Sequence, residues 1–113
     1  MTSVQPAAAV RGRTIRLIWT EGPTKGSTHE HVFHQDGTVE WHDPKTAQKA
    51  GPAKERPKYG ATKVADDIYA VSYLAPSGYT LTVVLNFRDH KMVGFASGAK
   101  EWYPVQGSFE VVQ

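Results

Sequence analysis

The chain of 113 residues contains no cysteine. Disulfide bonds, thiolate nucleophiles and zinc fingers are therefore excluded. Charge of one sign is also scarce, because 13 Lys and Arg stand against 11 Asp and Glu, which leaves a net charge of +2. That balance gives no reason to expect a nucleic acid or an anionic membrane as a partner. No apolar run approaches the ~18–20 residues of a membrane-spanning helix.

The beginning of the chain also lacks a targeting pattern. Residues 1–10 have no basic start followed by an apolar stretch, so we expect no secretory signal and a cytoplasmic location. We expect a disordered tail over residues 1–11 and one domain over residues 12–113, because a second core would need roughly 50 residues or more of its own.

Helical periodicity is nearly absent, and short alternating segments separated by turn residues take its place. This pattern predicts antiparallel strands joined in a meander. The predicted strands are Arg13–Trp19, Thr28–His34, Thr38–His42, Tyr59–Val64, Ile68–Leu74, Tyr79–Phe87, Lys91–Ser97, Glu101–Val105 and Ser108–Val112.

Turn residues separate these segments. Asp36-Gly37 is a hairpin signal, Ala75–Gly78 carries Pro at the second turn position, and Arg88–Lys91 is polar throughout. Residues 43–58 contain several prolines and predict a lid-like loop. Its basic residues favour a solvated flap over a lid that binds anions; they are Lys45, Lys49, Lys54, Arg56 and Lys58.

An open sheet of about eight or nine strands would leave two unpaired edges and one uncovered apolar face. No helix is predicted that could cover that face. We therefore predict an all-β fold, a small antiparallel up-and-down barrel of about eight strands, with a tight sandwich as the alternative.

Hairpin pairing predicts which side chains enter the barrel, because cross-strand partners share a face. A two-residue loop at Asp36-Gly37 pairs His34 with Val39 and Val32 with Trp41. The more apolar face, which we place inside, then carries Glu30, Val32, His34, Val39 and Trp41. The opposite face carries His29, His31, Phe33, Glu40 and His42. A bulged three-residue loop would reverse one strand.

The Ala75–Gly78 turn, treated in the same way, pairs Ser72 with Leu81. The next turn then places Gly94 and Ala96 on the inner face, where small side chains leave room in a barrel. The outer face becomes strongly apolar, which predicts either a second packed layer or a homodimer. The residues expected at that dimer interface are Tyr69, Val71, Val84, Val93 and Phe95.

Several segments resemble the MoaF-like family, which is named after molybdenum cofactor biosynthesis protein F. They span nearly the whole chain after the tail and are Gly12–Trp19, Pro23–Gly26, His29–Trp41, Ser77–Leu81, Trp102–Val105 and Gly107–Glu110. The resemblance implies a lipocalin-like barrel of the calycin type, and it implies no particular chemistry. The implied barrel is also similar to that of phenolic acid decarboxylases, whose Tyr, Arg and Glu act inside the barrel. None of those residues can be matched to a position here.

Glu30 is the main chemical candidate, because a carboxyl group inside an apolar barrel would have a raised pKa and could bind or protonate a ligand. The alternative is a solvated Glu30 at the rim or one paired with Arg16. His34 is expected near the barrel mouth, with a structural role favoured. His29, His31 and His42 could together hold a metal ion, but exposed strand histidines are favoured instead.

The sequence thus predicts a small-molecule binding protein with a mostly apolar or aromatic ligand inside the barrel. We expect no cofactor and no metal, and no catalytic residue is assigned. The predicted ligand-binding residues are Glu30, Trp19, Trp41, Tyr79, Phe87, His34, Leu17 and Leu81. The alternatives are an acid/base lyase or isomerase using Glu30 in the same cavity, or a dimerising interaction module.

Overall fold

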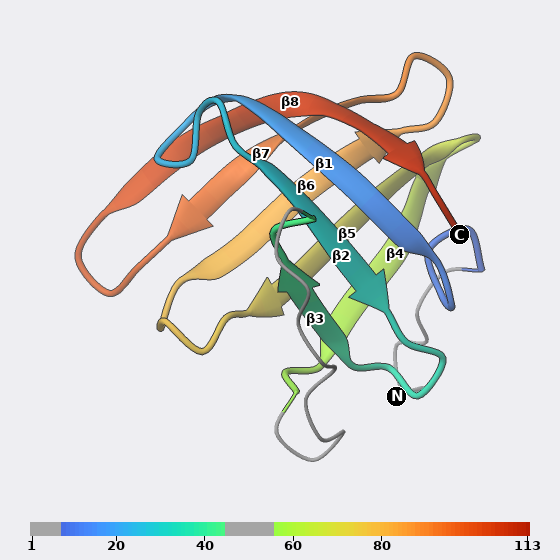
Figure 1. The fold of residues 1–113 in the computed structure, drawn as a ribbon, viewed down its shortest axis with the longest axis horizontal. Coiled ribbons are helices and arrows are strands. Elements are labelled where there is room, and N and C mark those ends of the chain that lie inside the picture. The colour runs from blue at the N-terminus through green and yellow to red at the C-terminus, as the bar shows by residue number, and fades with distance from the viewer. Residues whose placement is uncertain (1–7, 45–55) are drawn as a thin grey trace.

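The computed structural model describes residues 8–44 and 56–113. Eight antiparallel strands form one sheet in the order β3-β2-β1-β8-β7-β6-β5-β4 (Figure 1). The strands are β1 Thr14–Glu21, β2 Thr28–Phe33, β3 Val39–His42, β4 Tyr59–Ala65, β5 Ile68–Leu74, β6 Thr80–Asn86, β7 Lys91–Ser97 and β8 Trp102–Val111. The all-β, barrel-like class predicted from the sequence is confirmed. The described residues hold no helix long and apolar enough to cross a membrane.

The curled sheet brings its two edge strands, β3 and β4, together at one end. The backbone N–H of Val39 donates to the carbonyl of Pro57 (2.9 Å), and that of Tyr59 donates to the carbonyl of Gly37 (3.0 Å). The half-buried Arg56 reinforces this junction, because its guanidinium donates to Thr38 Oγ1 (2.9 Å) and Asp36 Oδ2 (3.1 Å). The two backbone hydrogen bonds satisfy groups that an open sheet edge would leave unpaired.

Glycines on neighbouring strands let the sheet curl. A Cβ built on Gly94 in β7 would overlap the carbonyl oxygen of Thr82, and one on Gly107 in β8 would overlap that of Ile18. Glycine inside a strand commonly marks such a tight bend. The chain was expected to break near Gly107 into two strands, but β8 runs through it as a single bent strand. Gly94 therefore allows the sheet to bend, and it does not provide the room for a ligand that the sequence predicted.

The facing predicted for β2 is wrong. Phe33, not His34, pairs with Val39, and His31 pairs with Trp41. The loop is Gln35-Asp36-Gly37, with a turn bond from Gly37 N–H to His34 O (3.1 Å) and a φ of 88° at Gly37. This is the bulged three-residue loop, and its odd length reverses β2 relative to the prediction. His29, His31 and Phe33 consequently face inward.

The same loop geometry reverses β5. Gly78 N–H donates to Ala75 O (2.9 Å), and Gly78 has a φ of 94°. Tyr73 therefore pairs with Leu81, and Val71 pairs with Val83. Side chains that were expected on the outer face are inside: Tyr69, Val71 and Tyr73 belong to the core or pack against it.

The inward facing of Met92, Gly94 and Ala96 on β7 is confirmed, because the β6–β7 register differs from the prediction by an even number of residues. Val84, Val93 and Phe95 consequently remain on the outer face, and the ring of Phe95 contacts that of Trp102 edge-on (centroids 5.5 Å apart). Tyr69 and Val71 cannot contribute to a dimer interface from inside the barrel. The dimer itself stays a prediction.

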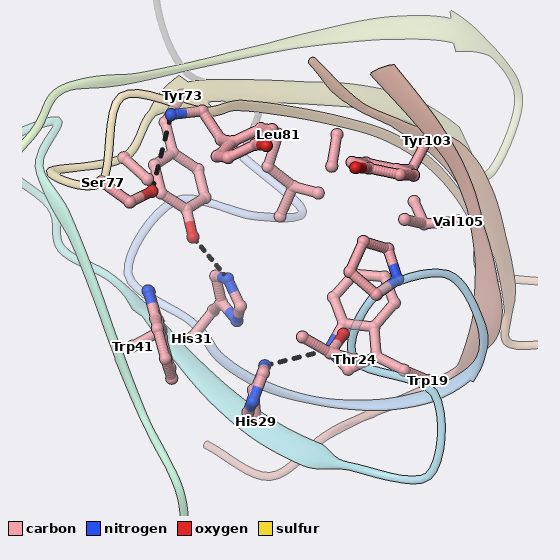
Figure 2. A pocket seen from close by; sticks show the side chains of 14 residues that line it. Trp19, Thr24, His29, His31, Trp41, Tyr73, Ser77, Leu81, Tyr103 and Val105 are labelled. Atoms are coloured by element: carbon pink, nitrogen blue, oxygen red, sulfur yellow. Dashed lines mark hydrogen bonds between the residues drawn. The ribbon is translucent and has the colours of Figure 1, made fainter. Parts of the chain in front are cut away.

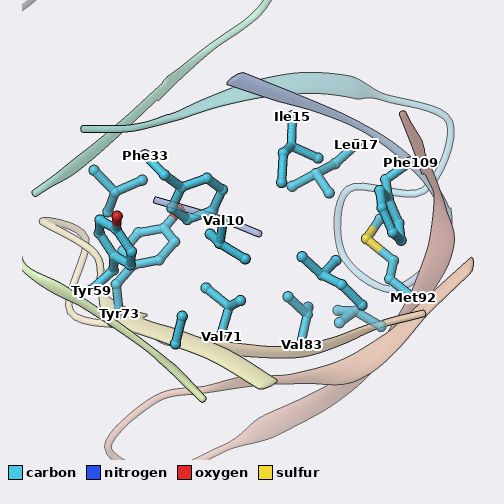
Figure 3. Packing of buried hydrophobic residues seen from close by; sticks show 14 of the residues in the cluster. Val10, Ile15, Leu17, Phe33, Tyr59, Val71, Tyr73, Val83, Met92 and Phe109 are labelled. Atoms are coloured by element: carbon cyan, nitrogen blue, oxygen red, sulfur yellow. The ribbon is translucent and has the colours of Figure 1, made fainter. Parts of the chain in front are cut away.

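One end of the barrel is packed with apolar side chains (Figure 3). Val10 is fully buried there, among residues such as Phe33, Val71 and Ile15. The sequence predicted a disordered tail over residues 1–11. This is wrong for residues 8–11, which form turns, and residues 1–7 lie outside the described residues. Most of the lid-like loop, including Lys45, Lys49 and Lys54, also lies outside them.

Alanine at Gly107 should destabilise the protein by about 2 kcal/mol or more, because the new methyl group overlaps the β1 backbone. Gly60→Ala is the matched control, since nothing lies within 4 Å of a Cβ at this strand position. Its expected effect is zero to about 1 kcal/mol of stabilisation. Urea unfolding measures both, and equal effects of the two substitutions would contradict the curvature role.

Candidate ligand-binding site

The other end of the barrel opens into a cavity of about 330 Å³ (Figure 2). Strand ends and the loops beside them build its wall. The lining residues are Trp19, Pro23, Thr24, His29, His31, Trp41, Tyr73, Ala75, Ser77, Tyr79, Leu81, Ala96, Tyr103 and Val105. Aromatic rings dominate this wall, and no Asp, Glu, Lys or Arg occurs among the described residues that line it.

Half of the residues predicted to bind a ligand line this cavity: Trp19, Trp41, Tyr79 and Leu81. Leu17 is buried one layer deeper, beside a small internal void that it shares with His31 and Phe33. Phe87 does not reach the cavity. Its ring packs against Tyr69 and Phe109 near the opposite end, at centroid distances of 5.6 and 5.0 Å.

The predicted inward position of Glu30 is wrong. Glu30 pairs with Arg16 across β1 and β2, on the face opposite to Leu17 and Trp19. The guanidinium of Arg16 donates to Glu30 Oε2 through Nε (3.0 Å) and Nη2 (2.8 Å), and it also donates to Glu110 Oε1 (2.8 Å). The bond to Glu30 is the main reason why the pKa of Arg16 is raised above its ordinary value. An ion pair on the outer face thus replaces the expected interior acid.

His34 is also on the outer face, because β2 is reversed. Its Nε2 lies 3.2 Å from Glu40 Oε2 across the hairpin. The structural role that the sequence favoured for His34 fits this contact, but its expected position near the mouth does not. Neither Glu30 nor His34 lines the cavity.

His31 and Tyr73 form a buried polar pair at the bottom of the cavity. Nε2 of His31 lies 2.8 Å from Tyr73 Oη, and His31 is 2% exposed. Its other ring nitrogen, Nδ1, is buried and has no hydrogen-bond partner among the described residues. Burial lowers the pKa of His31 to about 3 and raises that of Tyr73. Both groups are therefore uncharged at neutral pH.

His29 lies on the same face of β2, closer to the mouth. The indole N–H of Trp19 donates to His29 Nδ1 (3.0 Å), and the imidazole packs against the ring of Trp41 with centroids 4.5 Å apart. Burial lowers the pKa of His29 below its ordinary value, although the charge of Asp43 opposes that shift. The two histidines that were expected on the outside thus supply polar groups to the cavity.

Two tyrosines on the cavity wall share a carboxylate. Tyr79 Oη donates a short hydrogen bond to Glu101, which raises the pKa of Tyr79 to about 12 and lowers that of Glu101. The same carboxylate raises the pKa of Tyr103. The shared carboxylate links the beginning of β8 to the turn before β6, and holds both phenol rings at the mouth.

The three histidines considered for a metal ion do not converge. His42 pairs with Glu30 on the outer face and lies 3.6 Å from its Oε1, whereas His29 and His31 face inward. No group of three or more His, Asp or Glu suited to a metal ion occurs in residues 8–44 and 56–113.

A sequence comparison supplies the family. The MoaF N-terminal domain family matches residues 2–101. The chain belongs to the MoaF family. This membership confirms the resemblance seen in the sequence. No curated protein matches the chain.

A solved structure shows the same fold as this MoaF-family chain. It is a protein from Burkholderia vietnamiensis described as a "putative beta-lactamase", which is 19% identical, with a TM-score of 0.68. The match covers 97% of this chain and 100% of that one. At this identity the likeness shows the fold alone.

Acid should destabilise this MoaF-family protein through His31. Because its pKa falls from 6.5 in the unfolded chain to about 3 in the folded protein, the unfolded chain binds the proton first as the pH falls. The contribution of His31 is therefore full above pH 6.5 and is lost toward pH 3, at no more than about 1.4 kcal/mol per pH unit.

Urea unfolding across this pH range should give a shallower pH dependence for His31→Gln than for the wild type. His90→Asn is the control, because His90 occupies a turn with a φ of 58° that Asn tolerates. A His31→Gln variant with the same pH dependence as the wild type would contradict the buried, neutral imidazole.

Proposed function

We propose that this MoaF-family protein binds a mostly apolar or aromatic small molecule in the open end of its barrel. The observation that carries the proposal is the cavity of about 330 Å³, whose wall is largely aromatic and lacks charged side chains among the described residues. Ligand pockets in proteins occupy roughly 300–1,000 Å³ and combine apolar walls with a few polar groups. The mouths of β-barrels are a common place for them.

The arrangement of the rings supports a flat ligand. Trp19 and Trp41 lie on either side of His29, and Tyr79 and Tyr103 lie with ring centroids 6.5 Å apart. Aromatic rings prefer offset or edge-on contacts with other rings, which stabilise a flat guest beyond the burial of its surface. The packed opposite end supports a single entrance, since Val10 and its neighbours fill the barrel there.

The Glu30-based enzyme is not part of this proposal, because that carboxylate is held outside the barrel by Arg16. The description of the Burkholderia protein as a putative beta-lactamase applies to that protein, and no hydrolytic activity is carried over from it to this chain. A cytoplasmic location and a homodimer stay predictions.

The uncharged fluorescent dye N-phenyl-1-naphthylamine tests the proposal. We expect its emission to rise on titration with the protein and to saturate at one site. Ala96→Leu should weaken binding at least about tenfold, because the larger side chain enters the cavity from β7.

Glu30→Gln is the matched control, since Glu30 lies on the outer face, and its affinity for the dye should stay within about twofold of the wild type. Absence of saturable binding would overturn the proposal. Equal affinities of the wild type and Ala96→Leu would place the dye elsewhere and would also overturn it.

A further inference from the structure

We propose that the ligand is an uncharged ring compound that offers a carbonyl-type oxygen to the ring N–H of His31. This inference rests on the proposed function and names the chemical class that the same cavity takes. It is carried by the buried Nδ1 of His31, which has no partner among the described residues, together with the hydrogen bond that fixes where the imidazole proton lies.

The proton of His31 is assigned by Tyr73. The phenol needs an acceptor for its own O–H, and His31 Nε2 at 2.8 Å is the acceptor that the described residues provide. If the phenol donates to Nε2, the neutral imidazole carries its proton on Nδ1. Figure 2 shows this nitrogen on the side of the ring away from Tyr73, facing the space that the lining side chains enclose. An unused buried donor is costly, so the site favours a guest that supplies an acceptor.

His29 has the opposite tautomer. An indole N–H can only donate, so His29 Nδ1 must accept the bond from Trp19 at 3.0 Å. The neutral ring then carries its proton on Nε2. With these tautomers neither imidazole keeps a free lone pair, and the buried N–H without a partner among the described residues is that of His31 Nδ1.

The side chains that line the cavity favour an uncharged ligand. Among the described residues, no Lys or Arg lines the cavity, and both histidines are held neutral by burial. A carboxylate would lose its hydration without gaining a cation, and an ammonium group would lose it without gaining an anion. A ketone, lactone or quinone oxygen loses far less hydration and still accepts the His31 hydrogen bond.

Three naphthalenes of nearly equal shape test the inference, by displacement of N-phenyl-1-naphthylamine. They are 2-acetylnaphthalene, 2-isopropenylnaphthalene, in which CH₂ replaces the carbonyl oxygen, and 2-naphthoate. We expect the ketone to bind about tenfold more tightly than the alkene, and the carboxylate to bind most weakly. An alkene or carboxylate that matches the ketone would overturn the inference while leaving the cavity as a binding site. Failure of the dye and of all three compounds to bind would overturn the proposed function itself.

His31→Phe should abolish the preference for the ketone over the alkene, because the variant removes the N–H and keeps a ring. Tyr73→Phe is a second variant should His31→Phe not fold; it should reduce the preference, because it removes the bond that fixes the tautomer of His31. His34→Gln on the outer face is the control and should keep the preference of the wild type. A ketone preference that survives His31→Phe would contradict the assigned donor.

Discussion

Two hairpin loops, Gln35-Asp36-Gly37 and Pro76-Ser77-Gly78, decide which side chains of β2 and β5 enter the barrel. In each loop a glycine with positive φ occupies the fourth turn position and donates to the carbonyl three residues earlier. That geometry gives the connection an odd number of residues. Because side chains alternate between the two faces of a strand, the parity of a loop fixes the facing of the whole strand that it joins. The inward facing of His29, His31 and Tyr73 in the cavity is a consequence of these two loops.

The facing of β2 also satisfies the electrostatics. An inward Glu30 would have to lose its hydration or its proton, whereas outward it accepts two hydrogen bonds from Arg16. An imidazole has a neutral form near pH 7, so His29 and His31 can be buried at a smaller cost. Trp19 and Tyr73 then satisfy one nitrogen of each ring. One strand thus carries an ion pair outside and two neutral hydrogen-bonding groups inside.

The sequence predicts the fold class and most of the strands, because alternation and turn residues are local signals. The inward residues of β6 and β7 are also predictable, since the error in their register is even. The facing of β2 and β5 is not obtained from sequence. A two-residue and a three-residue loop can share the same Asp36-Gly37 pair, and a four-residue and a three-residue loop can share Pro76-Ser77-Gly78. A usable signal was present in Glu30, since a buried carboxylate without a partner argues against the facing that places it inside.

The residues of the candidate site were found or missed according to whether the facing of their segment was predicted correctly. Trp19, Trp41, Tyr79 and Leu81 are identified from sequence because the inward facing expected for them is correct. His29, His31 and Tyr73 are missed because they lie on the two reversed strands. Phe87 faces inward but too far along its strand to reach the open end, and alternation carries no information about depth within a barrel. Depth follows from the packing of Val10 and the aromatic residues at the closed end.

The central claim is that His29 and His31 lie inside the barrel as neutral rings in opposite tautomers. Long-range ¹⁵N–¹H correlation spectra of the imidazole nitrogens at neutral pH test it most directly. The account predicts a proton on Nε2 of His29 and on Nδ1 of His31, with the His31 signals unchanged down to about pH 4 because its pKa is about 3. A His31 ring that titrates near pH 6.5, or one protonated on Nε2, would contradict it.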